Sequence, residues 1–138
     1  MTDWNGINQK KEELLAALPS FIVDKYDGKV GIYKITIEGK LAYVGKSTNC
    51  LRRWIAHKIN TLYNFHQHDY YEEKYAIFRD AYNHNYSISC DIIEECEEEE
   101  LATRERYWIE KLNPPLNGGR ATIGWKGWEL LDSIENPQ

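Results

Sequence analysis

The sequence has 138 residues, of which 42% are hydrophobic and 13% aromatic, and its formal net charge at pH 7 is −5. This length accommodates one domain with a hydrophobic core, and the composition excludes a disordered tail. No apolar run approaches the roughly 18 residues of a membrane-spanning helix, so we expect no association with a membrane.

The N-terminus and the cysteines bear on the cellular setting. The first residues lack the charged and then apolar pattern of a secretory signal segment. Cys50, Cys90 and Cys96 form no CxxC spacing, so the sequence predicts neither a disulfide framework nor a zinc site. We therefore expect a reducing, cytoplasmic location.

Charge is unevenly distributed along the chain. Acidic residues concentrate in the stretch 91–100, whereas the stretch 46–58 contains no acid. The basic residues and the histidine of that second stretch are Lys46, Arg52, Arg53, His57 and Lys58. A net acidic protein lacks the broad basic surface of many DNA-binding proteins, but a local positive patch is compatible with nucleic acid.

The first half of the chain predicts a helix and a hairpin. Residues 8–18 are expected to form a helix that a proline ends, and residues 30–37 form a β-rich run. Residues 38–40 make a tight reversal into a second strand over 41–44. Gly45 closes this strand, and the two runs together indicate a β-hairpin.

The next helix is expected to run to about residue 62, with Ser47 or Thr48 as its N-cap. Arg53 and His57 lie four residues apart on the side opposite its apolar stripe, so we expect them to be neighbours outside the core. The stripe itself consists of Leu51, Ile55, Ile59 and Leu62, with Trp54 at its edge.

Three further elements are predicted. A helix over 70–83 carries an aromatic stripe, residues 87–94 form a third strand, and a last helix spans 97–112 with acids in its first turn. The stripe of the first of these consists of Tyr71, Tyr75, Phe78 and Tyr82. The tail after residue 117 has weak periodicity and is not assigned. The order is β-β-α-α-β-α, with an added helix in front.

Glu105 is the main anomaly of the sequence, because it lies in the middle of the apolar stripe of the last helix. It follows Leu101 by four residues and precedes Ile109 by four. The full stripe is Leu101, Ala102, Trp108, Ile109 and Leu112. A carboxylate that faces a core is costly unless it is paired, protonated or metal-bound. The structural alternative is an ion pair, with Arg52, Arg53 or Arg104 as the partner.

Two tyrosines and two glycines stand in the predicted hairpin. Tyr33 and Tyr43 are each flanked by glycine and branched apolar residues, and alone they are typical of residues that fill a sheet face. Gly31 and Gly45 are poor strand residues, so they indicate a close backbone approach or a bulge.

Taken in chain order, five short motifs resemble those of the GIY-YIG nuclease family. They are Gly31-Ile32-Tyr33, Tyr43-Val44-Gly45, Arg53 with His57 four positions later, Glu105 in a Glu-Arg-Tyr-Trp-Ile-Glu segment, and Asn117 after Pro114-Pro115-Leu116. The resemblance covers about residues 29–117, which we take as the nuclease domain. Residues 1–28 and 118–138 would form an N-terminal helical extension and a C-terminal extension. The family fold agrees with the order above, so we predict an α+β protein with a small three-stranded antiparallel sheet flanked by helices.

The resemblance implies an endonuclease that hydrolyses DNA phosphodiester bonds. It implies one divalent cation, Mg²⁺ with Mn²⁺ as a substitute, bound through Glu105 and completed by waters. Arg53 would hold a non-bridging phosphate oxygen, and a tyrosine would activate the water. For that base we favour Tyr33, with Tyr43 in support.

The resemblance implies supporting roles for the remaining motif residues. His57 would donate to a phosphate or relay a proton, and Lys46 would add a phosphate contact. Asn117 would orient the site, which Gly31 and Gly45 would support. No second DNA-binding domain is identified, so specificity would come from the 64–86 region, the first 28 residues, the tail, a partner chain or a homodimer.

Two other functions are consistent with the same fold. One is a catalytically silent nucleic-acid-binding module, and the other is a protein-interaction domain. The second predicts that Glu105 is paired to an arginine and has no open metal position.

Overall fold

The computed structural model of the chain describes the backbone of residues 4–63, 73–118 and 120–136, and the side chains of 9–59, 61, 74–118 and 126–136. Its elements are α1 (Trp4–Ala17), α2 (Ser20–Tyr26), β1 (Gly31–Ile37), β2 (Lys40–Ser47), α3 (Cys50–Tyr63), α4 (Glu73–Asn83), β3 (Ile88–Glu95), the short 3-10 helix η2 (Glu98–Glu100), α5 (Leu101–Leu112) and α6 (Arg120–Glu135). None of the described helices is long and apolar enough to cross a membrane.

The three strands form one antiparallel sheet in the order β2-β1-β3, which confirms the predicted fold class. The strand β1 is central, so β2 and β3 are the two edges. The second strand is longer than predicted, because Gly45 does not close it but pairs with Tyr33 inside the ladder. Helices α2 and α6 were not predicted from the sequence.

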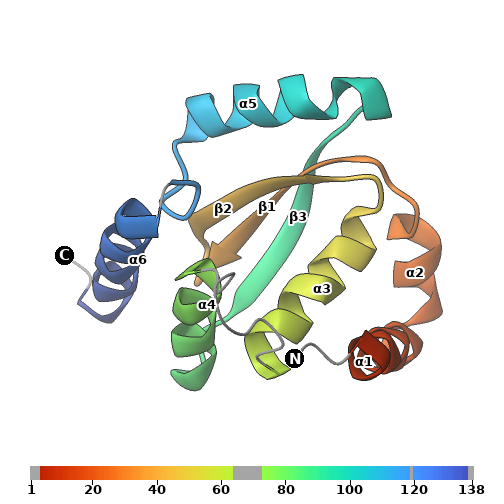
Figure 1. The fold of residues 1–138 in the computed structure, drawn as a ribbon, viewed down its shortest axis with the longest axis horizontal. Helices are drawn as coiled ribbons and strands as arrows, with labels where there is room; N and C mark the ends of the chain where they lie inside the picture. The colour runs from red at the N-terminus through yellow and green to blue at the C-terminus, as the bar shows by residue number, and fades with distance from the viewer. Residues whose placement is uncertain (1–3, 64–72, 119, 137–138) are drawn as a thin grey trace.

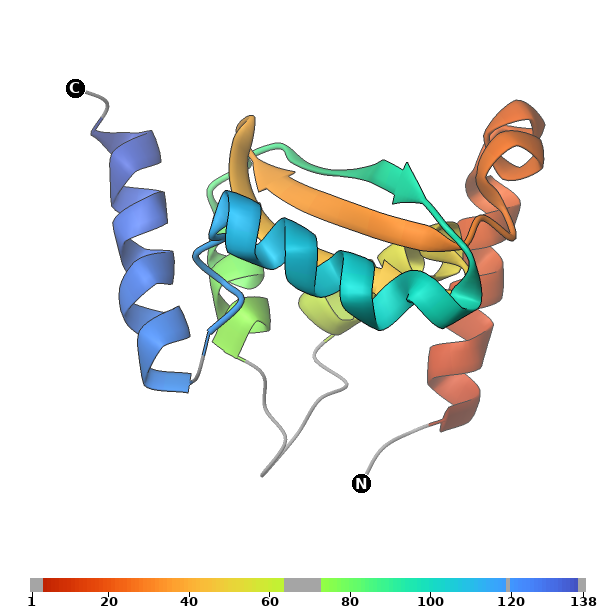
Figure 2. The same ribbon diagram turned by 90° about the horizontal axis from the view of Figure 1, so that it is seen from above.

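Helices cover the two faces of the sheet unequally. Helix α5 lies on one face, and α3 and α4 lie on the other (Figures 1 and 2). Side chains of β1 alternate between these layers. Ile32 packs with Val44 and Leu101 on the α5 side, whereas Tyr33 and Ile35 belong to the larger core on the α3 and α4 side.

Helix α3 is packed on two sides, which corrects one prediction. Its stripe of Leu51, Ile55 and Ile59 is buried as expected, but these residues pack against leucines of α1 and against Tyr26. The opposite side of α3 therefore faces the sheet and not the solvent. His57, which we placed outside the core, is only 1% exposed. The predicted stripe member Leu62 lies outside the described side chains.

Helix α4 is also packed on two sides. Tyr75 and Phe78 are buried as predicted, but Tyr82 is 54% exposed, so its assignment to the stripe is wrong. The predicted member Tyr71 lies outside the described residues. The buried face of α4 includes Ile77 and not Tyr82, because α6 packs against α4 at Ile77. A Cβ added at Gly127 of α6 would lie 2.5 Å from Ile77 Cγ1.

A charged clamp fixes α5 to the sheet. The Glu94 carboxylate on β3 accepts hydrogen bonds from Arg104 Nε and Nη2, both at 2.7 Å, and from Trp108 Nε1 at 2.8 Å. Leu101, the first residue of α5, is buried, whereas Ala102 is exposed. The prediction that Ala102 belongs to the apolar stripe is therefore wrong. The clamp sets the rotation of α5 and hence the direction of the neighbouring Glu105.

Glu94→Gln tests the clamp. The Arg104 guanidinium, and then Trp108, hold the pKa of Glu94 below its usual value of 4.5. The stabilisation is therefore present above about pH 4.5 and is lost as the pH falls through the pKa of the folded state. We expect a lower Tm for the variant at pH 7 and a smaller difference at pH 3, measured by circular dichroism melts.

Glu95→Gln is the matched control, because Glu95 is the next residue and its ion pair to Lys29 is exposed. It should change the Tm little at either pH. Equal effects of the two substitutions would show that the clamp adds nothing to the stability of the fold.

Candidate functional site

Tyr33 of β1 and Gly45 of β2 are directly opposite in the sheet. A Cβ added at Gly45 would overlap the Tyr33 hydroxyl and Cζ, so the ring occupies the space that a side chain there would fill. A Cβ at Gly31 would likewise overlap the Glu94 carbonyl oxygen of β3. The close approaches expected at both glycines are therefore present. The first of them turns the phenol of Tyr33 toward α3.

A chain of hydrogen bonds starts at that phenol. Tyr33 Oη lies 2.7 Å from His57 Nε2, and His57 Nδ1 lies 2.8 Å from Tyr75 Oη. Arg53 also hydrogen-bonds Tyr33, and a guanidinium can only donate. A neutral His57 ring donates from one nitrogen and accepts at the other, so its tautomer sets the direction of both hydrogen bonds. This arrangement is a ready path for a proton between β1, α3 and α4.

Burial governs the proton affinity of this group. Burial raises the pKa of Tyr33 well above its ordinary value, and Tyr43 adds to this effect, whereas Arg53 opposes it. Burial acts to lower the pKa of Arg53, but the phenols of Tyr75, Tyr33 and Tyr43 outweigh it and raise that pKa. Arg53 is therefore a half-buried, permanently charged cation among tyrosines.

The two consecutive arginines of α3 have different surroundings. The exposed Arg52 donates from Nε to Asp27 Oδ1 at 3.2 Å, and its backbone N–H donates to Asn49 Oδ1 at the same distance. Asn49 is thus the cap of α3, and the predicted caps Ser47 and Thr48 precede it. Arg52 anchors the start of the helix, which leaves Arg53 as the arginine of the site.

Tyr43 stands on the same face as Tyr33 but is only half-buried. Its ring centroid lies 6.4 Å from that of Tyr33 and 5.7 Å from that of His57. On α4, Lys74 Nζ lies 4.7 Å from the centroid of the Tyr43 ring, and the Lys74 residue is 9% exposed. Lys74 is not among the predicted site residues, although a lysine in the buried row with Ile77 and Phe78 is an anomaly of the same kind as Glu105.

Glu105 lies on the other side of the sheet, on α5. Its side chain is 24% exposed, so the carboxylate borders the core and is not enclosed by it. Its partner is Lys46, whose Nζ lies 3.9 Å from Oε1, at the outer limit of an ion pair. Among the described side chains, no hydrogen bond or ion pair joins Glu105 to Tyr33, Tyr43 or Arg53. The predicted alternative partners Arg52 and Arg104 are bound to Asp27 and Glu94 instead.

Asn117 connects the two sides at the outer edge of β2. Its Oδ1 accepts from the Val44 N–H, and its Nδ2 donates to the Val44 carbonyl, both at 2.8 Å. The N–H of Leu116 donates to the Ala42 carbonyl at 2.9 Å. Residues 114–117 therefore occupy this edge as a fourth strand would. Val44 stands between Tyr43 and Gly45, so Asn117 fixes the strand that carries both.

The predicted site residues thus form two groups that flank one edge strand. Tyr33, Tyr43, Arg53 and His57 meet on the α3 and α4 side. Lys46 and Glu105 meet on the α5 side. Between them runs β2 with Asn117 at its edge. Within the described part of the chain, no three His, Cys, Asp or Glu side chains come together as a metal cluster. A cation here would bind through one carboxylate and water.

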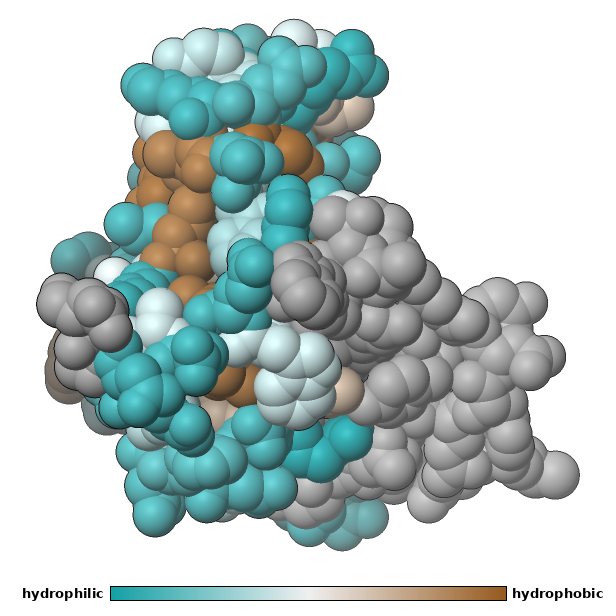
Figure 3. Space-filling view, turned by 90° about the vertical axis from the view of Figure 1, so that its left-hand side faces the viewer, coloured by the Kyte–Doolittle hydropathy of each residue, from teal (hydrophilic) through white to brown (hydrophobic). Residues whose placement is uncertain are grey.

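The surface around the two groups differs in polarity. In the space-filling view the outer surface of α5, at the top, is hydrophilic, and an apolar band lies beneath it (Figure 3). Partly buried hydrophobic residues that pack between α5 and the sheet include Leu41, Ile93, Ile109 and Leu112. Glu105 therefore presents a carboxylate at the border of an apolar layer, which limits the number of protein ligands available to a cation.

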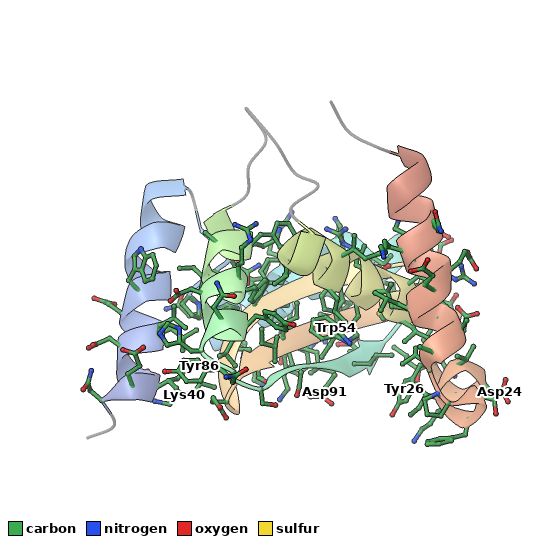
Figure 4. All side chains as sticks on the ribbon, turned by 90° about the horizontal axis from the view of Figure 1, so that it is seen from below. Asp24, Tyr26, Lys40, Trp54, Tyr86 and Asp91 are labelled. Carbon is green, nitrogen blue, oxygen red and sulfur yellow. The ribbon has the colours of Figure 1, made fainter. Side chains whose placement is uncertain are left out.

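A separate hollow of about 490 Å³ lies away from these groups, between α1, α2, α3 and β3. Figure 4 labels three of its lining residues, which are Tyr26 at the end of α2, Trp54 on α3 and Asp91 on β3. Most of its other lining side chains are aliphatic. A phosphate requires converging donors, so this apolar lining suits it poorly, and the chemistry of the described residues is concentrated at β2.

Comparison with known families identifies one match. The model of the GIY-YIG catalytic domain matches residues 29–118, which are most of the chain and include both groups of the site. No curated protein and no solved structure matches the chain. The matched range begins before β1 and ends just after Asn117, so it coincides with the sheet, its covering helices and the segment that closes β2. The chain therefore belongs to the GIY-YIG family, whose members are endonucleases that depend on a divalent metal.

Proposed function

We propose that this protein is an endonuclease that hydrolyses DNA phosphodiester bonds with one divalent cation, Mg²⁺, for which Mn²⁺ can substitute. The observation that carries the proposal is the convergence of Arg53, His57 and two tyrosines beside a strand whose other side carries Glu105. Phosphodiester hydrolysis requires a positioned water, a cation at the phosphate and stabilisation of the leaving oxygen. The two groups supply residues for each of these tasks.

Glu105 is the residue that would hold the cation. Its carboxylate is partly exposed and its ion pair to Lys46 is long, so its oxygens are accessible to a hydrated ion. Magnesium is commonly bound by one or two carboxylates with waters completing the shell. When bound, the cation would polarise the phosphate and stabilise the leaving oxygen. Lys46 would then turn from Glu105 to a phosphate oxygen.

Arg53 would bind a non-bridging phosphate oxygen. Its charge is retained despite partial burial, and Tyr33 fixes one side of the guanidinium. A planar guanidinium that is already oriented stabilises charge that develops in the transition state without further reorganisation. Asn117 holds the backbone of Val44 and so keeps β2 in register with these groups.

The exposures of the two tyrosines favour different roles. Tyr33 is only 1% exposed and its hydroxyl is hydrogen-bonded to His57, so it fits a relay inside the protein. Tyr43 is half-buried and can meet a water at the surface. We therefore propose Tyr43 as the base that contacts water, and Tyr33 as the residue that orients Arg53 and His57. This replaces our sequence-based preference for Tyr33.

The rival interaction domain predicts an arginine paired with Glu105. The described partner of Glu105 is Lys46, and Arg104 is bound to Glu94. This arrangement favours the nuclease over the rival. A Mn²⁺ soak that places an ion beside Glu105 would support the same conclusion, whereas an ion-free Glu105 at saturating Mn²⁺ would favour the silent module or the interaction domain.

Glu105→Ala should abolish metal-dependent cleavage of supercoiled plasmid while the fold is retained, because the only proposed protein ligand of the cation is removed. Nicking and linearisation would be followed on gels with Mg²⁺, Mn²⁺ or EDTA, and the fold by circular dichroism. Glu110→Ala is the control, since Glu110 is exposed on the same helix. Full Mg²⁺-dependent activity of Glu105→Ala would remove Glu105 from the metal site.

Arg53→Ala should lower kcat by about 10²–10³-fold, the loss typical of removing one donor to the transition state. Binding of the same DNA in EDTA, measured by fluorescence anisotropy, should change little. Arg52→Ala is the matched control, because Arg52 is the preceding residue and contacts Asp27. A comparable fall in kcat for both variants would contradict the separate role of Arg53.

Tyr43→Phe should lower kcat by about 10²–10⁴-fold, the usual contribution of a general base. Tyr33→Phe should reduce stability by about 1–3 kcal/mol, because it removes the buried hydrogen bond between the Tyr33 hydroxyl and His57. Single-turnover cleavage and thermal melts of both variants provide the comparison. Tyr43→Phe with normal kcat, together with an inactive Tyr33→Phe, would reassign the base to Tyr33.

A further inference from the structure

Lys74 occupies a core position that the proposed mechanism does not use. It lies on α4 in the row that continues with Ile77, Phe78 and Ala81, and all three of these are at most 2% exposed. Lys74 itself is 9% exposed. A lysine is seldom buried, because its ammonium loses hydration that must be replaced by other interactions. An aliphatic residue in this row would avoid that cost.

The ammonium of Lys74 is directed at the tyrosines of the site. Its Nζ lies 4.7 Å from the ring centroid of Tyr43 and 5.3 Å from that of Tyr75. Tyr75 is the last member of the hydrogen-bonded chain that begins at Tyr33. Both distances are within the range of a cation–π interaction, in which the negative face of the ring attracts the charge. Lys74 therefore bridges the end of this chain and the ring of Tyr43.

We infer that Lys74 is a positioning residue of the nuclease site and acts through Tyr43. This inference rests on the proposed nuclease function. The lysine fixes the Tyr43 ring from the side of α4, and its positive charge favours the phenolate form of Tyr43, which takes the proton of the attacking water and returns to the neutral phenol. Arg53 approaches the same tyrosines from α3. The site thus has a cation on each of the two helices that cover this face.

Lys74→Met tests the role of the charge, because methionine retains an unbranched side chain of similar length. We expect a folded protein whose kcat falls by about 100-fold, the order of loss that follows when a reacting group is misplaced by about 1 Å. The KM for DNA should stay within about threefold, since the lysine is buried away from the substrate. Lys74→Arg should restore kcat to within about tenfold of the wild type.

Lys25→Met is the matched control. Lys25 also lies over an aromatic ring, with Nζ 5.3 Å from the centroid of Tyr26, but it is exposed on α2 and outside both groups of the site. Its substitution should leave both kcat and KM unchanged. If Lys74→Met does not fold, Lys74→Gln replaces it as the neutral variant, and thermal melts accompany every kinetic measurement.

The double variant Lys74→Met, Tyr43→Phe determines whether the lysine acts through Tyr43. If it does, adding Lys74→Met to Tyr43→Phe should lower kcat by less than about twofold, because the effects of residues that act as a unit are not additive. A full additional 100-fold loss would overturn the inference. So would a neutral variant with wild-type kcat, or a loss of kcat that Lys74→Arg does not restore.

The wild type, measured in parallel, separates this inference from the proposed function. Absence of metal-dependent cleavage by the wild type would contradict the nuclease itself. Cleavage by the wild type that Lys74→Met matches would contradict only the role of Lys74.

Discussion

The site depends on one steric relation, the ring of Tyr33 lying across Gly45. Because Gly45 has no side chain, the phenol passes over the neighbouring strand and reaches His57 of α3. His57 in turn contacts Tyr75 of α4, so one ring ties the sheet to both helices on this face. Any larger residue at position 45 would displace Tyr33 and release Arg53 with it. Gly45 therefore influences the positions of His57 and Arg53 through the ring of Tyr33.

The division of the site by β2 has an electrostatic consequence. The chain is net acidic, and α5 follows a run of glutamates, so an anionic substrate such as DNA would be attracted only locally. The cations of the site are distributed over three elements, with Lys46 on β2, Arg53 on α3 and Lys74 on α4. Two of these are shielded from bulk water, where their fields are less screened than at the surface. Strength of binding would thus come from few, well-placed charges.

The sequence predicts correctly those parts of the fold that depend on residues close together in the chain, such as a turn or the apolar stripe of one helix. The hairpin follows from its turn, and the stripe of Leu51, Ile55 and Ile59 follows from its period. The close approaches at Gly31 and Gly45 are predictable because a glycine weakens a strand unless a neighbour uses the space that a side chain would fill. The family resemblance is carried by motifs that lie within these same elements, and the match to residues 29–118 confirms it.

The wrong predictions have a common cause. Each of these helices packs against a second element of the fold, and the sequence pattern of one helix does not show that element. His57 is buried because α1 takes the apolar stripe of α3 and turns the opposite side to the sheet. Tyr82 is exposed because α6 shifts the buried face of α4 toward Ile77, the row to which Lys74 belongs. The pairing of Glu105 with Lys46 depends on how α5 crosses β2, which the clamp at Glu94 sets. The period of the apolar residues shows which face of a helix is apolar, but it does not show how many other elements pack against that helix.

The two hydrogen bonds between Asn117 and Val44 have a consequence for solubility. An edge strand normally offers its backbone to strands of other molecules, and this recruitment is a common route to aggregation. A side-chain amide satisfies the exposed donor and acceptor without adding any charge. The backbone of Val44 is therefore already paired, which closes this part of the edge to strands of other molecules.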